Sequence, residues 1–141
     1  MYITISSNTN PEHAHMNSPH HFKVCLDNPL NLNSNMECAL VDFTCFTSKI
    51  GARVKQIFIY LNMVEEQPVG TSRKSLLRNT IVTGNRLQME KFTPPYYKPV
   101  KQLKTNVMEV YITDENGMEA SFLNKTTTCT FHFKKKSWPS S

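Results

Sequence analysis

The chain has 141 residues, of which 39% are hydrophobic and 19% charged, and 16 Lys and Arg against 11 Asp and Glu give a net charge of +5. This length suits one domain with a hydrophobic core, whereas two half-sized domains would need metal ions or disulfides for stability. The four glycines form neither of the phosphate-binding loops GxGxxG and GxxxxGK[ST], which excludes nucleotide chemistry by those routes.

From the sequence we expect no targeting signal. It has no apolar run of about 18 residues, and Met1–Thr4 lacks the basic and apolar regions of a signal peptide. We therefore expect no membrane contact, and synthesis in a reducing compartment, the cytoplasm or nucleus of a host cell.

Hydrophobic residues alternate with polar ones along most of the chain, which predicts β-strands rather than helices. The alternation places Phe22, Val24 and Leu26 on one strand face. On the next strand Ile57 and Ile59 share a face with Leu61 and Met63, opposite Phe58 and Tyr60. In chain order the predicted strands are 22–26, 56–64, 76–82, 107–113 and 127–134, with helical turns possible at 72–80 and 86–91.

Pro, Gly and Asn residues separate these runs, and Asn116-Gly117 favours a hairpin turn. The pattern predicts an all-β domain over residues 1–133, a single jelly-roll-like β-sandwich of about eight short antiparallel strands. An immunoglobulin-like sandwich is the alternative, although its Cys, Trp, Cys pattern is missing. Residues 134–141 are expected to form a basic C-terminal tail.

The four cysteines contain no CxxC pair, and Cys25, Cys38 and Cys129 lie inside apolar runs. We therefore interpret the cysteines as small buried hydrophobes rather than as a disulfide framework. The Asn124 sequon is then expected to be unused, since glycosylation needs secretion.

Two groups of residues are candidates for chemistry. The first is a histidine cluster within one polar loop, where a metal ion is a weak possibility because structural sites usually draw ligands from separate elements. Its members are His13, His15, His20 and His21. The second is a catalytic triad of Ser, His and Asp, which can be assembled on paper from the residues present. The sequence does not support it, because no serine lies in a G-x-S-x-G turn. The sequence therefore predicts no enzyme, no catalytic residues and no cofactor.

The segment 92–100 combines three aromatic residues with three prolines, a composition that suits an anchor at a protein interface. A loop that covers its own sandwich is an equally good interpretation. The candidate subunit interface comprises Phe58, Tyr60, Phe92, Tyr96 and Tyr97. Lys134, Lys135 and Lys136 would contact nucleic acid or an acidic partner without sequence preference.

The order of segments resembles the penton or minor capsid proteins of polinton and adintovirus-like elements. Residues 22–32 and 37–43 resemble the family's F-x-V-x-L-x-x-P-I-x-L and W-E-V-A-L runs, with Met36 where the family has Trp. The segments 96–100, 108–117 and 130–135 are similar to its Y-x-P-V, I-E-V-x-I-x-D-x-x-G and V-x-L-H-F-R ending. Together these segments cover about half of the chain.

This resemblance implies a virion protein without an active site. It would be a single jelly roll that forms pentamers at icosahedral vertices, beside a larger major capsid protein. Two alternatives remain open. One is a monomeric β-sandwich that binds a protein or glycan partner. The other is a basic nucleic-acid-binding β-barrel, with Phe58, Tyr60 and Tyr111 as stacking platforms.

Overall fold

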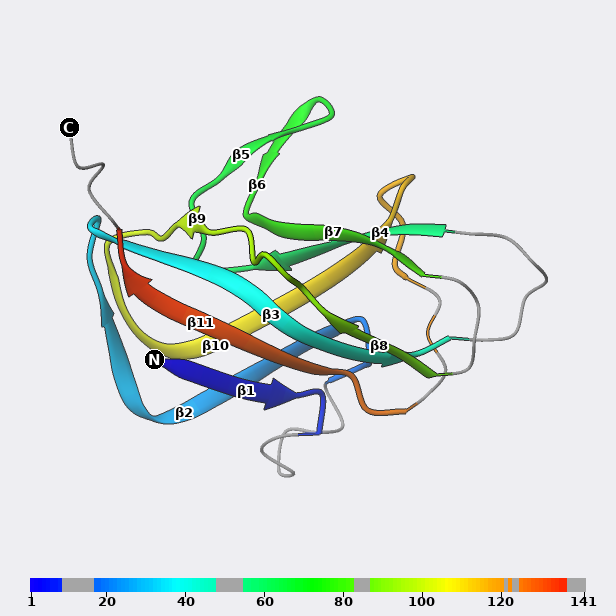
Figure 1. The fold of residues 1–141 in the computed structure, drawn as a ribbon, viewed down its shortest axis with the longest axis horizontal. Coiled ribbons are helices and arrows are strands. Elements are labelled where there is room, and N and C mark those ends of the chain that lie inside the picture. The colour runs from blue at the N-terminus through cyan, green and yellow to red at the C-terminus, as the bar shows by residue number, and fades with distance from the viewer. Residues whose placement is uncertain (9–16, 48–54, 83–86, 121, 123–124, 137–141) are drawn as a thin grey trace.

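The structure is a computed structural model that describes residues 1–8, 17–47, 55–82, 87–120, 122 and 125–136. All regular secondary structure in this part of the chain is β (Figure 1). The strands are β1 (Tyr2–Ser6), β2 (His21–Leu32), β3 (Met36–Phe46), β4 (Lys55–Leu61), β5 (Gln67–Val69), β6 (Ser72–Lys74), β7 (Leu76–Val82), β8 (Leu87–Lys91), β9 (Lys98–Pro99), β10 (Leu103–Asp114) and β11 (Thr128–Lys135).

Two antiparallel sheets form the sandwich, and we call them sheet A and sheet B. Sheet A has the order β1-β11-β3-β8, with β9 also paired to β3, and sheet B has the order β2-β10-β4-β7. The short hairpin β5-β6 stands apart from both sheets. Gly70 forms its turn with a φ of +61°, a left-handed conformation that glycine adopts without steric cost.

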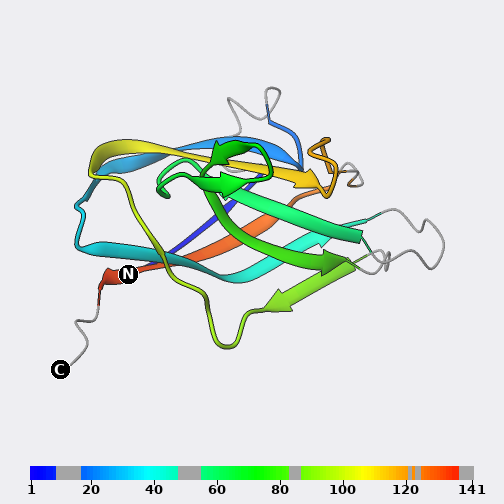
Figure 2. The same ribbon diagram turned by 90° about the horizontal axis from the view of Figure 1, so that it is seen from above.

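The strand pairs are nested in the sequence. The first strand pairs with the last, and β2 with β10, β3 with β8 and β4 with β7 lie successively further inside. Successive pairs alternate between the sheets, with β1-β11 and β3-β8 in sheet A and β2-β10 and β4-β7 in sheet B, which is the jelly-roll arrangement. Figure 2 shows the two sheets as separate layers. The predicted jelly-roll-like sandwich is confirmed.

The space between the sheets is filled by one continuous hydrophobic core. The alternation that predicted strands also supplies this core, since Phe22 and Val24 of β2 and Ile57 and Ile59 of β4 all point inward and are buried. The largest fully buried side chains include Phe22, Phe43, Phe131, Phe133, Leu40, Leu61, Met63 and Met108.

Some predicted local structure is wrong. The helical turns expected at 72–80 and 86–91 are strands β6, β7 and β8, because pairing with β5, β4 and β3, respectively, outweighs weak helix propensity. Cys25 was expected to be buried but is exposed, since it alternates out of phase with Phe22 and Val24. The predicted turn after β10 is confirmed, with Gly117 at a φ of +78° and the Asp114 carboxylate accepting the Asn116 and Met118 amides.

The boundary expected at residue 134 falls inside β11. Lys134 pairs with Glu37 and Lys135 with Met36 in the ladder between β11 and β3, and the Lys136 amide donates to the Asn35 carbonyl. The basic cluster is therefore part of sheet A, and only residues 137–141 of the expected tail lie outside the described residues. The described residues contain no helix with the length and apolar character needed to cross a membrane.

Truncation of Phe131 tests the core. Phe131 is fully buried and lies opposite Leu40 and Ile3 in the ladders of sheet A. We expect Phe131→Ala to lower the free energy of unfolding by about 3–5 kcal/mol, from lost burial and the cavity left behind. Urea denaturation measures this change. The control Lys91→Ala, at an exposed position of β8, should change it by less than about 0.5 kcal/mol, and equal effects of the two variants would contradict the proposed core.

Candidate functional site

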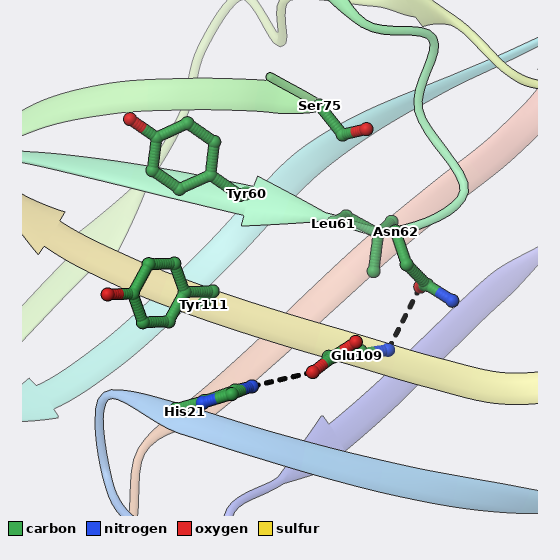
Figure 3. A pocket seen from close by; sticks show the side chains of 7 residues that line it. All are labelled: His21, Tyr60, Leu61, Asn62, Ser75, Glu109 and Tyr111. Atoms are coloured by element: carbon green, nitrogen blue, oxygen red, sulfur yellow. Dashed lines mark hydrogen bonds and ion pairs between the residues drawn. The ribbon is translucent and has the colours of Figure 1, made fainter. Parts of the chain in front are cut away.

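A hollow of about 320 Å³ lies on the outer face of sheet B. Tyr60 of β4 and Tyr111 of β10 are direct cross-strand partners, and the adjacent pair of Ile59 and Ile112 points into the core. The two tyrosines therefore face away from the core. Seven residues line the hollow: His21, Tyr60, Leu61, Asn62, Ser75, Glu109 and Tyr111 (Figure 3).

One wall of the hollow is aromatic. The rings of Tyr60 and Tyr111 lie side by side with centroids 6.2 Å apart, and their hydroxyls point in the same direction (Figure 3). Tyr60 is only 8% exposed, and the Lys74 ammonium lies 5.6 Å from its ring centroid. Tyr111 is half-buried and meets the His21 ring edge-on at 5.0 Å. Tyr60 thus forms the back of the hollow, and Tyr111 its more accessible surface.

The polar groups lie beside the aromatic wall. His21 Nε2 lies 2.6 Å from Glu109 Oε2. Asn62 holds this region of β10 in place, because its side-chain amide donates to the Val107 carbonyl at 3.0 Å and accepts the Glu109 amide at 2.9 Å. The hollow therefore combines a mostly apolar aromatic wall with a carboxylate, an imidazole and hydroxyl groups. Small-molecule sites typically show this combination.

A second cluster lies on the outer face of sheet A, centred on His132 of β11. The Tyr2 ring stacks on the imidazole with centroids 4.3 Å apart, and the Tyr97 hydroxyl lies 2.7 Å from His132 Nδ1. Lys134 lies 4.2 Å from the Tyr97 ring centroid and 3.6 Å from the Glu37 carboxylate. Desolvation by burial lowers the pKa of His132, and the N-terminal ammonium and Lys134 lower it further.

The segment between β8 and β9 covers the open edge of the sandwich between β7 and β8. Phe92 is only 7% exposed and belongs to the core. The Arg78 guanidinium of β7 is held between two rings of this segment, 4.1 Å from the Phe92 centroid and 4.0 Å from that of Tyr96. The Arg78 atoms Nε and Nη1 are buried without a hydrogen-bond partner, so the ring faces provide the main stabilisation of its charge.

The five predicted interface residues do not form one surface. Tyr60 lines the hollow on sheet B, Phe92 belongs to the core, and Tyr97 contacts His132 on sheet A. Phe58 is half-buried, and Tyr96 is 57% exposed. The segment 92–97 thus covers its own sandwich, which was one of the two interpretations, while Tyr96 still presents a large surface to a neighbour.

Only part of the predicted histidine cluster can be placed. His13 and His15 lie outside the described residues. His20 Nε2 lies 3.0 Å from the Glu119 carboxylate, and His21 contacts Glu109, so the two adjacent side chains have different partners. Among the residues that the structure describes, no three His, Cys, Asp or Glu side chains are placed to hold a metal ion together.

Three cysteines are buried as free thiols: Cys38, Cys45 and Cys129. Burial raises the pKa of Cys45 to about 12, with a further contribution from Glu90, and it also raises the pKa of Cys38 and Cys129. Buried thiols of this kind are inert as nucleophiles and metal ligands. For these three residues the interpretation as small hydrophobes is confirmed.

Sequence reasoning missed Glu109, Asn62 and Ser75 as residues of the hollow. They come from β10, from the residue after β4 and from the link between β6 and β7. The only signal in the sequence was the alternation that put Tyr60 and Tyr111 on the outer faces of their strands. No protein-family model matches the chain, and no curated protein matches its sequence.

The pKa of His132 gives a pH dependence that can be measured. Because this pKa is lower in the folded chain than its ordinary 6.5, the unfolded chain binds the proton first on acidification. Stability contributed by neutral His132 is complete above about pH 7.5 and declines as the pH falls below about 6.5. We expect the melting temperature of His132→Gln to fall less than that of the wild type between about pH 7.5 and about pH 5. Identical pH slopes would contradict this prediction.

A double-mutant cycle tests the stacking of Arg78 on Tyr96. We expect Arg78→Met and Tyr96→Ala each to destabilise the chain, with a coupling of about 0.5–2 kcal/mol in urea denaturation. A matched control is the pair Arg73→Met and Tyr96→Ala, because Arg73 donates to the Glu66 carbonyl instead. This control pair should be additive, and an additive Arg78 cycle would show that the stacked arrangement contributes nothing.

Proposed function

We propose that this chain is a non-enzymatic structural subunit of a virion, a minor capsid protein of penton type that assembles into pentamers beside a major capsid protein. The observation that carries the proposal is the nested pairing of β1 with β11, β2 with β10, β3 with β8 and β4 with β7. Viral capsid domains use this jelly-roll arrangement, as do lectin domains and cupins.

The interior of the sandwich supports a structural role over the cupin type of jelly roll. Phenylalanine and aliphatic side chains fill the space between the two sheets. The described residues that point inward form no cluster of metal ligands there. A domain whose interior is packed in this way offers its outer faces, loops and edges to partners.

The outer face of sheet A supplies a surface for assembly. Leu87 and Met89 of β8 lie opposite Phe46 and Thr44 of β3, and they point outward because their neighbours on β8 lie opposite the buried Cys45 and Phe43. Met89 is 69% exposed. Four of the seven exposed large hydrophobic residues in the described chain, Ile81, Leu87, Met89 and Tyr96, lie within residues 81–96. Leu87 and Met89 lie two residues apart on one strand face, and exposed apolar side chains of this kind are typical of protein interfaces.

The basic residues at the end of β11 suit a further contact. Lys134 is engaged by Glu37 and Tyr97, whereas Lys135 and Lys136 are exposed. We propose that these two lysines contact packaged nucleic acid or an acidic surface of a neighbouring subunit. Such a contact would depend on salt and not on nucleotide sequence.

Light scattering tests the assembly, with measurements at two salt concentrations and with and without a short DNA duplex. We expect a mass five times that of the chain. The double variant Leu87→Lys, Met89→Lys should be a folded monomer, because charge on an apolar contact surface opposes association. The matched control Met118→Lys changes an exposed methionine in the turn after β10 and should keep the pentamer.

A wild type that stays monomeric under all these conditions would overturn the proposal. A monomer whose mass rises only with DNA at low salt would favour the nucleic-acid-binding β-barrel instead. Near-UV circular dichroism verifies the fold of each variant, so that loss of assembly is not confused with unfolding.

A further inference from the structure

The hollow on the outer face of sheet B is a built site that the proposed assembly does not use. Its walls come from three strands and two links, with His21 on β2, Tyr60 and Leu61 on β4, Asn62 after β4, Ser75 before β7, and Glu109 and Tyr111 on β10. Residues more than 80 positions apart in the chain thus converge on one surface. The Asn62 side chain donates to the Val107 carbonyl and accepts the Glu109 N–H, so the Glu109 carboxylate is carried by a rigid part of the sheet.

The aromatic wall determines which shape of ligand fits. Tyr111 is half-buried and lies beside the Tyr60 ring at an interplanar angle of 30°, and because Tyr60 is only 8% exposed, the Tyr111 ring is the main apolar surface beside the polar groups (Figure 3). A flat ligand with C–H groups on its face would bury apolar area on this surface. The hydroxyls of the two tyrosines and of Ser75 act as both donors and acceptors, and the Glu109 carboxylate accepts only. A ligand with several hydroxyl groups around a compact ring matches this arrangement.

The charges around the hollow determine the charge of the ligand. The Lys74 ammonium lies over the Tyr60 ring, and His21 contacts the Glu109 carboxylate, so these charged groups already have partners. Among the described residues that line the hollow, Glu109 is the only acidic one. A neutral ligand needs no counter-charge from these groups and leaves their contacts intact.

We propose that this hollow binds a neutral pyranose sugar, with the sugar ring stacked on Tyr111 and its hydroxyls bonded to Glu109, His21 and Ser75. The proposal does not depend on assembly, because none of these residues lies among the exposed apolar side chains of residues 81–96. On a virion subunit such a site would face outward from sheet B and recognise a glycan.

The test is a titration followed by two-dimensional amide NMR of the full chain. The neutral probes are the methyl glycosides of glucose, galactose, mannose and N-acetylglucosamine. N-acetylneuraminic acid is the anionic probe, and Nα-acetyl-lysine amide, whose ε-ammonium stays charged, is the cationic one. We expect at least one neutral glycoside to shift the amides of Tyr111, Glu109 and Ser75 with a dissociation constant of about 1 mM. The two charged probes should leave these amides unshifted.

Variants separate the stacking from the hydrogen bonds. Tyr111→Ala should weaken binding at least about tenfold, whereas Tyr111→Phe keeps the ring and should retain most of the affinity. Glu109→Gln preserves the shape of the side chain and should weaken binding as well, which provides a second measure if Tyr111→Ala folds poorly. Met118→Ala, in the turn after β10, is the matched control and should bind like the wild type.

Three outcomes would overturn the proposal. They are the absence of shifts with all four neutral glycosides, shifts in the hollow with a charged probe alone, and equal binding by Tyr111→Ala and the wild type. Light scattering distinguishes failure of the sugar-binding proposal from failure of the assembly proposal. The Tyr111→Ala variant should have the same mass in solution as the wild type, whether or not it binds sugar.

Discussion

The ladders of β10 and β11 hold the rest of the structure together. Each of these two strands lies in the middle of a sheet, β10 between β2 and β4 and β11 between β1 and β3. Without them β2 would have no partner in sheet B and β1 none in sheet A, and a row of unpaired backbone groups would be left beside the core. Because both strands belong to the last third of the chain, the sandwich closes only when the C-terminal part pairs with strands formed much earlier.

Closing the sandwich leaves two different outer faces. On sheet B the side chains that alternate outward are the tyrosines, Glu109 and His21, and they surround a hollow. On sheet A they include Tyr2, which stacks on His132, and Lys134, which lies over the Tyr97 ring, while the Tyr97 hydroxyl is hydrogen-bonded to His132. The same alternation produces both faces, so the difference between an open site and a covered one comes from which residues the pairing brings into contact. An outer site and an outer assembly surface can therefore coexist on one small domain.

The edge between β7 and β8 shows how the two sheets are sealed where no ladder joins them. Arg78 enters this gap with its guanidinium between Phe92 and Tyr96, and the buried Phe92 completes the core. The aromatic and proline residues of this segment thus serve the subunit itself. Tyr96 stacks on Arg78 and remains exposed on its outer side, which makes the same segment available to a neighbouring molecule.

The sequence by itself determined the all-β class and the inward faces of several strands, since alternation predicted a strand with the observed ends of β7 and put Phe22 with Val24, and Ile57 with Ile59, on faces that are buried. It misjudged Cys25 and Lys134, because the composition of a run does not tell which face a residue takes or where a ladder continues. Only the tertiary structure decided the jelly-roll order and the hollow. The physical reason is that hydrophobic period reports which side of a strand is buried, whereas the partner of each strand depends on pairing between residues far apart in the chain. His21 and Glu109 became neighbours through that pairing alone.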